Sequence, residues 1–271
     1  MGHDAQAMTL RLLVTRPQPQ ADAWVVRLRE RGIDAHALPL LAIDAVVDLN
    51  ELHAAWHELS RYALAMFVSP NAVSHFFAAR PAEVAARGWP RATRAGATGP
   101  GTLQALHMAG VPPALCVAPP ADAAQFDSAA LWTQLQGERW AGREVLVLRG
   151  NGGRDEFAAL LREAGAAVHF TQAYRRGEPR FTAGEQALLE AAIARSAEHV
   201  WWLSSAEAVG YLPPLAPQAD WRHARALATH PRIAQRARAM GFGQVFEAPP
   251  TLDAVQAGLL QIERCLQSAP P

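Results

Sequence analysis

The chain has 271 residues, half of them apolar, so it can bury a substantial core in one large domain or two smaller ones. Lys+Arg and Asp+Glu are both 25, which excludes a global field that would attract nucleic acid or an acidic membrane surface. The two isolated cysteines, Cys116 and Cys265, are typical of a reducing cytoplasm, and neither a targeting segment nor an apolar run of roughly 18 residues is present to indicate secretion or a membrane span.

In chain order, short β-like apolar runs alternate with longer helical stretches rich in Ala, Leu and Arg. The predicted strands are 12–14, 64–68, 95–98, 115–118, 145–148, 168–170, 200–203 and 225–228. Helical stretches of ten or more residues separate most of them, for example 21–31, 155–164 and 231–240. This alternation predicts an α/β protein with parallel sheets covered by helices, and it fits poorly with separate all-α and all-β parts.

The sequence also repeats itself. A shift of 133 residues places Leu13-Val14-x-Arg16 on Leu146-Val147-x-Arg149, and a shift of 131 places 94–110 on 225–241. Two looser pairs, 67–73 with 203–209 and 118–120 with 248–250, recur in the same order. The pattern predicts two copies of one α/β unit of roughly 130 residues.

The repeat alone does not place the domain boundary. A contiguous cut falls near residue 138. A cyclic cut instead joins the first strand and helix to the last three blocks and leaves the middle of the chain as an inserted domain. Segments 37–43 and 170–176 occupy equivalent positions in the two copies, so they are candidates for the strands that cross between domains in the cyclic arrangement.

Short polar or glycine-rich turns recur where a predicted strand ends and a helix begins. At this edge of a parallel sheet the helix N-termini present unpaired N–H groups and a partial positive charge, which suit an anionic ligand. For each turn alone helix capping is the favoured explanation, but six of them on the same edge of two related units favour a ligand site. The turns are 69–71, 98–102, 127–128, 149–153, 204–205 and 229–231.

The turn at 149–153, RGNGG, is not a nucleotide loop. It lacks the Gly-Lys-Ser/Thr ending of a P-loop and the GxGxxG spacing of a dinucleotide turn. Its repeat counterpart at 17–20 contains no glycine, and the two copies share only the preceding arginine, Arg16 or Arg149. We therefore predict a strand-to-helix turn in which one copy became glycine-rich.

Tyr174 stands apart from the other aromatic residues. It lies in the second crossing segment and is followed by Arg175 and Arg176. In a crossing strand its phenol would be exposed and could reach a ligand; the alternative is an ordinary strand aromatic beside solvated arginines. His53 and His57 have the i, i+4 spacing of two metal ligands, but they lie in a polar helical stretch without the Glu of an HExxH motif, so we expect a solvated helix face and no metal site there.

The ordered motifs LLVTRP, FVSPNAV, GATGPGT, FDSAALW, VLVLRGNGGRDEFAALLREAGAAVHFTQAYRR, LSSAEAV and THPRIAQRARAMGF resemble the uroporphyrinogen-III synthase family, from about residue 11 to residue 262. The resemblance implies two similar doubly wound parallel-sheet, flavodoxin-like domains. Domain one would comprise 1–40 plus 176–271 and domain two 44–172, with hinge strands at 38–44 and 171–177. The activity implied is that of a cyclising hydro-lyase of tetrapyrrole and heme biosynthesis, which closes linear hydroxymethylbilane with loss of water and inversion of the terminal pyrrole ring, without metal or organic cofactor.

Carried over residue by residue, the resemblance makes Tyr174 the candidate catalytic residue, which would assist loss of the hydroxyl group. Helix N-termini and arginines would bind the substrate carboxylates. The substrate-binding candidates are Arg16, Ser69, Asn71, Gly99, Pro100, Gly101, Thr102, Ser128, Arg149, Gly150, Gly153, Ser204, Ser205, Thr229 and His230. At 230–233 this chain has HPRI where many members have Gly-Pro-Thr-Thr, so His230 departs from the family pattern.

We expect a cytoplasmic monomer that takes a small tetrapyrrole and binds neither nucleic acid nor membrane. A transient contact with hydroxymethylbilane synthase stays open. The competing hypothesis is a two-domain binding protein that holds a carboxylated or phosphorylated ligand without chemistry, because backbone cradles bind without catalysing.

Overall fold

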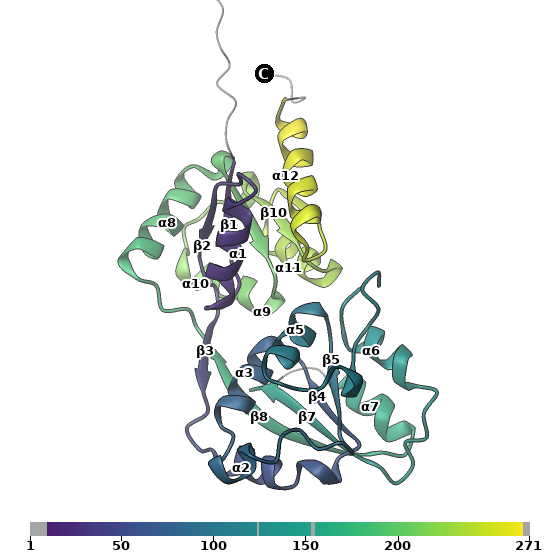
Figure 1. The fold of residues 1–271 in the computed structure, drawn as a ribbon. Coiled ribbons are helices and arrows are strands. Elements are labelled where there is room, and N and C mark those ends of the chain that lie inside the picture. Colours follow the sequence, from purple (N-terminus) through teal and green to yellow (C-terminus); the bar gives the residue numbers. More distant parts are fainter. Residues whose placement is uncertain (1–9, 124, 153–154, 268–271) are drawn as a thin grey trace, which may run out of the picture. The chain divides into compact units, whose positions relative to one another are not determined.

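The computed structural model describes residues 10–123, 125–152 and 155–267. The chain divides into two compact units, unit 1 with residues 1–42 and 177–271 and unit 2 with residues 43–176, and each contains its own sheet (Figure 1). The chain enters unit 2 between Ala42 and Ile43 and leaves it between Arg176 and Gly177. Every helix in the described ranges is too short or too polar to cross a lipid bilayer.

Unit 1 has a five-stranded sheet in the order β11-β10-β9-β1-β2, with all neighbouring strands parallel. Numbered along this unit alone, the order is 2-1-3-4-5, which is the flavodoxin order. Its elements are β1 (Arg11–Val14), α1 (Gln20–Arg29), β2 (Ala35–Ala37), α8 (Ala183–Ala194), η3 (Ser196–Glu198), β9 (His199–Leu203), α9 (Ala206–Val209), α10 (Leu212–Leu215), η4 (Trp221–His223), β10 (Arg225–Ala228), α11 (Pro231–Met240), β11 (Gln244–Glu247) and α12 (Leu252–Gln267).

Unit 2 has a six-stranded sheet in the order β3-β8-β7-β4-β5-β6, and the pairs from β8 to β6 are parallel. Its elements are β3 (Ala42–Ala45), α2 (Asn50–His57), η1 (Leu59–Arg61), β4 (Leu64–Phe67), α3 (Pro70–Ala78), α4 (Ala82–Ala85), β5 (Arg94–Ala97), α5 (Pro100–Met108), η2 (Pro113–Leu115), β6 (Cys116–Val117), α6 (Ser128–Leu135), β7 (Glu144–Gly150), α7 (Glu156–Glu163) and β8 (Ala167–Gly177).

The two sheets are circular permutations of each other. The repeat pairs β7, β8, β4, β5 and β6 with β1, β2, β9, β10 and β11, and both sheets place these counterparts in the same spatial order. When the strands of each unit are numbered in chain order, however, β4 to β8 have the spatial order 3-2-1-4-5, whereas the strands of unit 1 have the order 2-1-3-4-5. The predicted class, two doubly wound parallel-sheet domains, is confirmed, and the flavodoxin order itself applies to unit 1.

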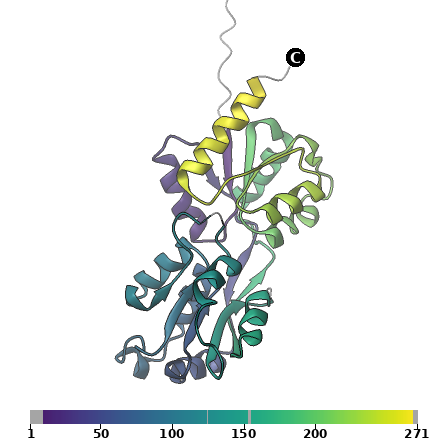
Figure 2. The same cartoon turned by 90° about the vertical axis from the view of Figure 1, so that its right-hand side faces the viewer.

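The central strands are apolar because helices cover both faces of each sheet. In unit 2, alternate residues of β4 and β7 pack against α2, α3 and α5 on one face and against α6 and α7 on the other. In unit 1, one face of β1, β9 and β10 packs against α1 and α12. Figure 2 shows α12, in yellow, lying across that sheet. Strand β9, HVWWL, is buried at all five positions.

Glycines that end helices mark the repeat in the backbone. Gly32, Gly165, Gly110 and Gly241 have φ angles of 76°, 91°, 87° and 107°, in the left-handed region that favours glycine. In each case the next residue donates its N–H to a carbonyl in the preceding helix. The four bonds are Ile33 to Leu28, Ala166 to Leu161, Val111 to Leu106 and Phe242 to Ala237. This is the Schellman ending, repeated at the two shifts of the sequence repeat.

Two predicted segments differ from the structure. The strand predicted across 37–43 is two strands, β2 ending at Ala37 and β3 beginning at Ala42, because Pro39 between them lacks an N–H for a sheet ladder. The turn at Asp127 and Ser128 does not directly follow a strand, since β6 ends at Val117 and an irregular segment precedes α6. The exposed edge strand β11 was not predicted; it offers little apolar pattern.

His199, at the start of β9, is fully buried. Its Nδ1 lies 2.9 Å from the carbonyl oxygen of Arg195, and because a carbonyl only accepts, Nδ1 carries the proton. Nε2 is buried without a hydrogen-bond partner in the described part of the chain. Burial lowers the pKa of His199, partly opposed by the hydrogen bond to the Arg195 carbonyl, so the folded state favours the neutral imidazole.

Acidification should therefore destabilise unit 1 through His199. A base whose pKa is lower in the folded state binds its proton first in the unfolded chain, so its effect is absent at high pH and grows as pH falls below about 6.5. Urea unfolding of His199→Asn, which keeps an N–H for Arg195, should show a smaller loss of stability than the parent chain as the pH falls from 7.5 to 5.5; equal slopes would contradict the assignment.

Candidate active site

Ser69 joins the end of β4 to the start of α3. Its backbone is extended and its Oγ accepts the N–H of Ala72 at 3.2 Å, so it is the N-cap of the helix. The same Oγ lies 3.1 Å from Oη of Tyr174 on β8. Strand β7 lies between β4 and β8 in the sheet, so the tyrosine side chain crosses one strand to reach the serine.

The Tyr174 side chain is only 3% exposed, which corrects the expectation of an exposed phenol. Its ring belongs to the apolar cluster between the sheet and α3. The His75 ring stacks on it with centroids 5.9 Å apart, and the Arg176 guanidinium lies 5.9 Å from its centroid. Burial lowers the pKa of His75, partly opposed by Asp44. The phenol is therefore held in one place by packing and by Ser69.

Gly150, the last residue of β7, is glycine for a steric reason. A Cβ at this position would lie 2.8 Å from Cε2 and 3.0 Å from Cζ of Tyr174, and 2.9 Å from Nε of Arg176. The β7–β8 register shifts here, so that Gly150 faces Tyr174 directly after Arg149 faces Gln172. The tyrosine ring thus passes over the strand where the strand has no side chain.

The rest of the glycine turn lies between β7 and α7, as the repeat predicts. Gly152 has a φ angle of 74°, a conformation that favours glycine. Gly153 lies outside the described residues. The glycines at 150 and 152 are therefore explained by a ring contact and a turn, whether or not a ligand also uses this backbone.

The N-terminus of α5 lies beside that of α3. A Cβ on Gly101 would lie 3.6 Å from Cγ of Pro70, and Thr98 Oγ1 donates to the Val68 carbonyl at 3.2 Å, which ties the ends of β5 and β4 together. Gly99 is the N-cap of α5. The candidates of these two turns that lie together are Ser69, Asn71, Gly99, Pro100, Gly101 and the buried Thr102.

Phe126 is a residue of this edge that the sequence reasoning missed. A Cβ on Gly99 would lie 3.0 Å from the Phe126 Cβ, so the loop before α6 packs directly over the α5 N-cap. The next residue, Asp127, caps α6 by accepting the Ala130 N–H at 2.9 Å, and Ser128 is the first residue of that helix. The spacing of FDS beside a helix start was visible, but its distance from Gly99 in space was not.

In unit 1, three adjacent strands end in candidate residues. Ser205 caps α9 by accepting the Ala208 N–H at 3.2 Å, and half-buried Ser204 precedes it. Thr229 donates its backbone N–H to Leu203 at 3.0 Å. Nδ1 of His230 accepts the Arg232 N–H at 3.2 Å, so His230 is the N-cap of α11.

Arg16, after β1, lies between two indole rings of unit 1. Its guanidinium carbon is 5.5 Å from the ring centroid of Trp24 and 5.3 Å from that of Trp202. The buried Nε has no hydrogen-bond partner within the described ranges, and burial lowers the pKa of Arg16 to about 10. A cation held by aromatic faces and lacking a carboxylate is suited to accept an external anion.

Arg149, the repeat counterpart of Arg16, has an internal partner instead. Its Nη1 lies 2.5 Å from the carboxylate of Asp155, and its guanidinium carbon lies 3.9 Å from the Phe170 ring centroid. Because that charge is already paired, Arg16 is the stronger candidate for binding a carboxylate.

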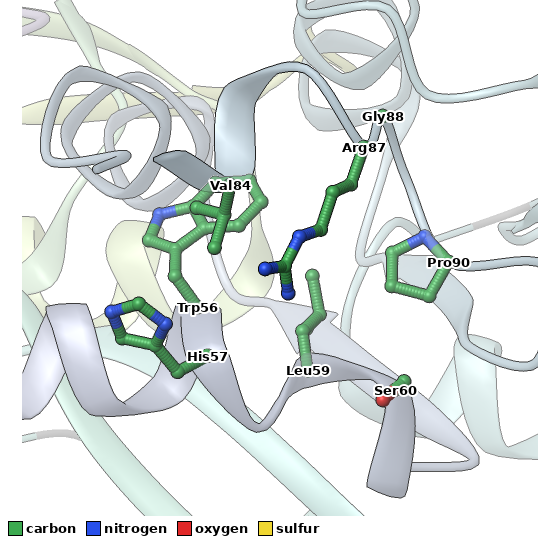
Figure 3. A pocket seen from close by; sticks show the side chains of 8 residues that line it. All are labelled: Trp56, His57, Leu59, Ser60, Val84, Arg87, Gly88 and Pro90. Carbon is green, nitrogen blue, oxygen red and sulfur yellow. The ribbon is translucent and has the colours of Figure 1, made fainter. Parts of the chain in front are cut away.

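A hollow of about 200 Å³ lies at the N-terminal ends of the unit 2 strands, formed by segments that precede β4 and β5 (Figure 3). Its lining residues are Trp56, His57, Leu59, Ser60, Val84, Arg87, Gly88 and Pro90, and none is a sequence-predicted site residue. No group of three or more His, Cys, Asp or Glu side chains in the described ranges could hold a metal ion.

The fold and these edges define a two-domain α/β protein with a row of helix N-termini at one edge of each sheet and a fixed phenol in one unit. The family model for uroporphyrinogen-III synthase HemD matches residues 22–256. The chain is 32% identical over 238 residues to the uroporphyrinogen-III synthase of Escherichia coli, covering 86% of this chain and 93% of that protein. It is 33% identical over 177 residues to that of Salmonella typhimurium, covering 65% and 69%.

Solved structures show the same fold. A mutant uroporphyrinogen III synthase from Thermus thermophilus matches 94% of this chain and 99% of its own, with a TM-score of 0.58 and 18% identity. Uroporphyrinogen-III synthetase from Helicobacter pylori matches 94% and 100%, with a TM-score of 0.53 and 14% identity. The chain belongs to the uroporphyrinogen-III synthase family, whose members are hydro-lyases of porphyrin biosynthesis.

Proposed function

We propose that this chain closes hydroxymethylbilane to uroporphyrinogen III with the phenol of Tyr174 assisting departure of the hydroxyl group. Family membership supplies the reaction. The observation that carries the residue assignment is the 3.1 Å contact between Tyr174 Oη and Ser69 Oγ beside the N-termini of α3 and α5.

The substrate supplies much of the driving force. Its electron-rich pyrroles expel the hydroxyl group with modest acid assistance, and that group leaves as water once it gains a proton. The resulting azafulvene cation is attacked by the substituted α-carbon of the terminal pyrrole, which gives a spiro intermediate. The bond from this carbon to its original bridging methylene then breaks, the methylene bonds to the unsubstituted α-carbon of the same ring, and loss of the proton from that carbon restores the pyrrole. Without control the bilane closes without inversion, so the main task of the enzyme is to fold it, which is orientation rather than strong acid–base catalysis.

Orientation would come from the substrate carboxylates. Backbone N–H groups at helix N-termini and the cation of Arg16 are groups that bind carboxylates without further ligands. We extend the proposal to all fifteen predicted binding positions: Arg16, Ser69, Asn71, Gly99, Pro100, Gly101, Thr102, Ser128, Arg149, Gly150, Gly153, Ser204, Ser205, Thr229 and His230. Residues 38–44 and 171–177, which include both passages of the chain between units, would serve as the hinge. In line with the family resemblance, the proposal includes no cofactor.

The proposed protein is a cytoplasmic monomer, with transient contact with hydroxymethylbilane synthase as its one proposed protein partner. The instability of the bilane, which closes spontaneously, favours such a handover.

One assay separates this enzyme from a binding protein of the same fold. Freshly made hydroxymethylbilane is added and the isomer of the cyclised product is identified against the spontaneous type I product. Catalysed formation of the III isomer is the expected result. Formation of the I isomer at the spontaneous rate would favour a binder.

Tyr174→Phe should lower the rate of III-isomer formation about tenfold, which corresponds to about 1.4 kcal/mol. The loss is partial because an activated leaving group can use water in place of the phenol. The matched control is Tyr62→Phe, which removes the hydroxyl of another buried tyrosine of unit 2 that packs against His169. A folded Tyr174→Phe protein with the full rate would refute the role assigned to this phenol.

A further inference from the structure

We infer that Asn151 and Arg176 are positioning residues for the phenol of Tyr174, and that the glycine turn after β7 is the clamp through which they act. The inference rests on the proposed role of Tyr174. Arg176 lies against the tyrosine ring and Asn151 holds the backbone of Arg176, and neither residue is proposed to bind the substrate.

The first part of the clamp is backbone pairing by a side chain. Asn151 Nδ2 donates to the carbonyl of Arg176 at 3.0 Å, and its Oδ1 accepts the N–H of the same residue. One amide therefore satisfies both backbone groups of the residue two positions beyond Tyr174, where β7 has ended and can no longer pair with β8.

The second part is the Arg176 side chain. Its Nη2 donates to the carbonyls of Asn151 at 3.3 Å and Gly152 at 3.0 Å, so it closes the turn from the opposite direction. Its guanidinium lies 5.9 Å from the Tyr174 ring centroid. The carbonyl oxygens of the turn therefore bind Arg176, which belongs to the same unit. The same arginine also lies against the tyrosine ring.

The third part is the clearance at Gly150. The ring crosses β7 there, with no room for a Cβ, and reaches Ser69 on β4. With Asn151 and Arg176 fixing β8 beyond the ring, and Gly150 fixing its distance from β7, the phenol oxygen is held at Ser69. Loosening either contact lets a flexible aromatic side chain leave that position, which costs rate without changing how the carboxylates bind.

The test is a double-mutant cycle between Asn151→Ala and Tyr174→Phe. Asn151→Ala should lower kcat about fivefold with KM within about twofold, and should slow Tyr174→Phe by less than about twofold, because a residue that acts through the phenol has nothing to position once the phenol is gone. Equal losses in both backgrounds would overturn the inference. If Tyr174→Phe instead keeps the full rate, the proposed acid role fails, and the cycle is then replaced by a direct observation of the ring.

That observation uses ring-labelled tyrosine, because the chain contains only three tyrosines. The NMR signal absent from Tyr174→Phe belongs to Tyr174, and we expect it to shift or broaden in Asn151→Ala and in Gly150→Ala. The matched control is Gly137→Ala, since Gly137 has ordinary φ and no atom within 4 Å of a Cβ. An unmoved Tyr174 signal in both turn variants would overturn the inference whatever the activities are.

Discussion

Replacing Arg16 with methionine should raise the KM for hydroxymethylbilane about ten- to hundredfold while the protein stays folded. A charge-assisted hydrogen bond to a carboxylate contributes roughly 1.5–3 kcal/mol, and Arg16 is half-buried with no carboxylate of its own in the described ranges. Because the contact would be made equally before and during ring closure, kcat should change little.

The stability of Arg16→Met distinguishes a binding residue from a structural one. Burying an uncompensated cation costs free energy, and the two cation–π contacts with Trp24 and Trp202 offset only part of that cost. Methionine keeps the apolar contact with both rings. We therefore expect the free energy of unfolding to stay within about 1 kcal/mol of the parent value or to rise.

Arg27→Met is the matched control. Arg27 also stacks on Trp24, at 4.9 Å, but it is exposed in the last turn of α1 rather than placed after β1. It should leave KM within about twofold. Steady-state kinetics of the three proteins, with unfolding curves, make the comparison; equal KM values for parent and Arg16→Met would remove Arg16 from the site.

Gly243→Ala should destabilise unit 1 by about 3 kcal/mol. A Cβ on Gly243 would lie 1.9 Å from the carbonyl oxygen and 2.8 Å from the carbonyl carbon of Arg222. Both atoms are backbone, so no rotamer change relieves the overlap. The Gly243 N–H also donates to Trp221 at 3.1 Å, and the required shift would weaken that bond.

The control for Gly243→Ala lies in the same unit. Gly184, near the start of α8, has no atom within 4 Å of a Cβ, so Gly184→Ala should be neutral or stabilising by up to about 1 kcal/mol. Thermal and urea unfolding of the two variants measure the contrast. A Gly243→Ala protein as stable as the parent would show that the η4 backbone can move away at little cost.

Much of the fold was predictable because its pattern is local and repeated. Apolar runs such as 64–68 and 200–203 became buried strands, and the shift of 133 residues anticipated that β1 and β7 are counterparts. Predictions failed where a single residue, or pairing with a strand distant in the sequence, determines whether a segment forms a strand. Pro39 splits one expected strand into β2 and β3, and β11 pairs with β10 despite a weak pattern of its own.

The candidate site was predictable as an edge but not as a set of contacts. Strand-to-helix turns indicated which residues cap helices, and Ser69, Ser205 and His230 do so. That Tyr174 is buried, crosses β7 at Gly150 and meets Ser69 depends on the spatial order of three strands. Similarly, the two arginines at equivalent repeat positions have different partners. Arg149 pairs with Asp155, whereas Arg16 packs against two indole rings.

The permuted strand order also determines the sequence of events during synthesis. Strands β1 and β2 leave the ribosome long before β9, which pairs with β1 in the finished sheet. All of residues 43–176 is made in between, and it contains every strand from β4 to β7 and nearly all of β8. The parallel strands of unit 2 can therefore pair before β9, the central neighbour of β1, has been synthesised. The inserted unit is thus the one that can fold first.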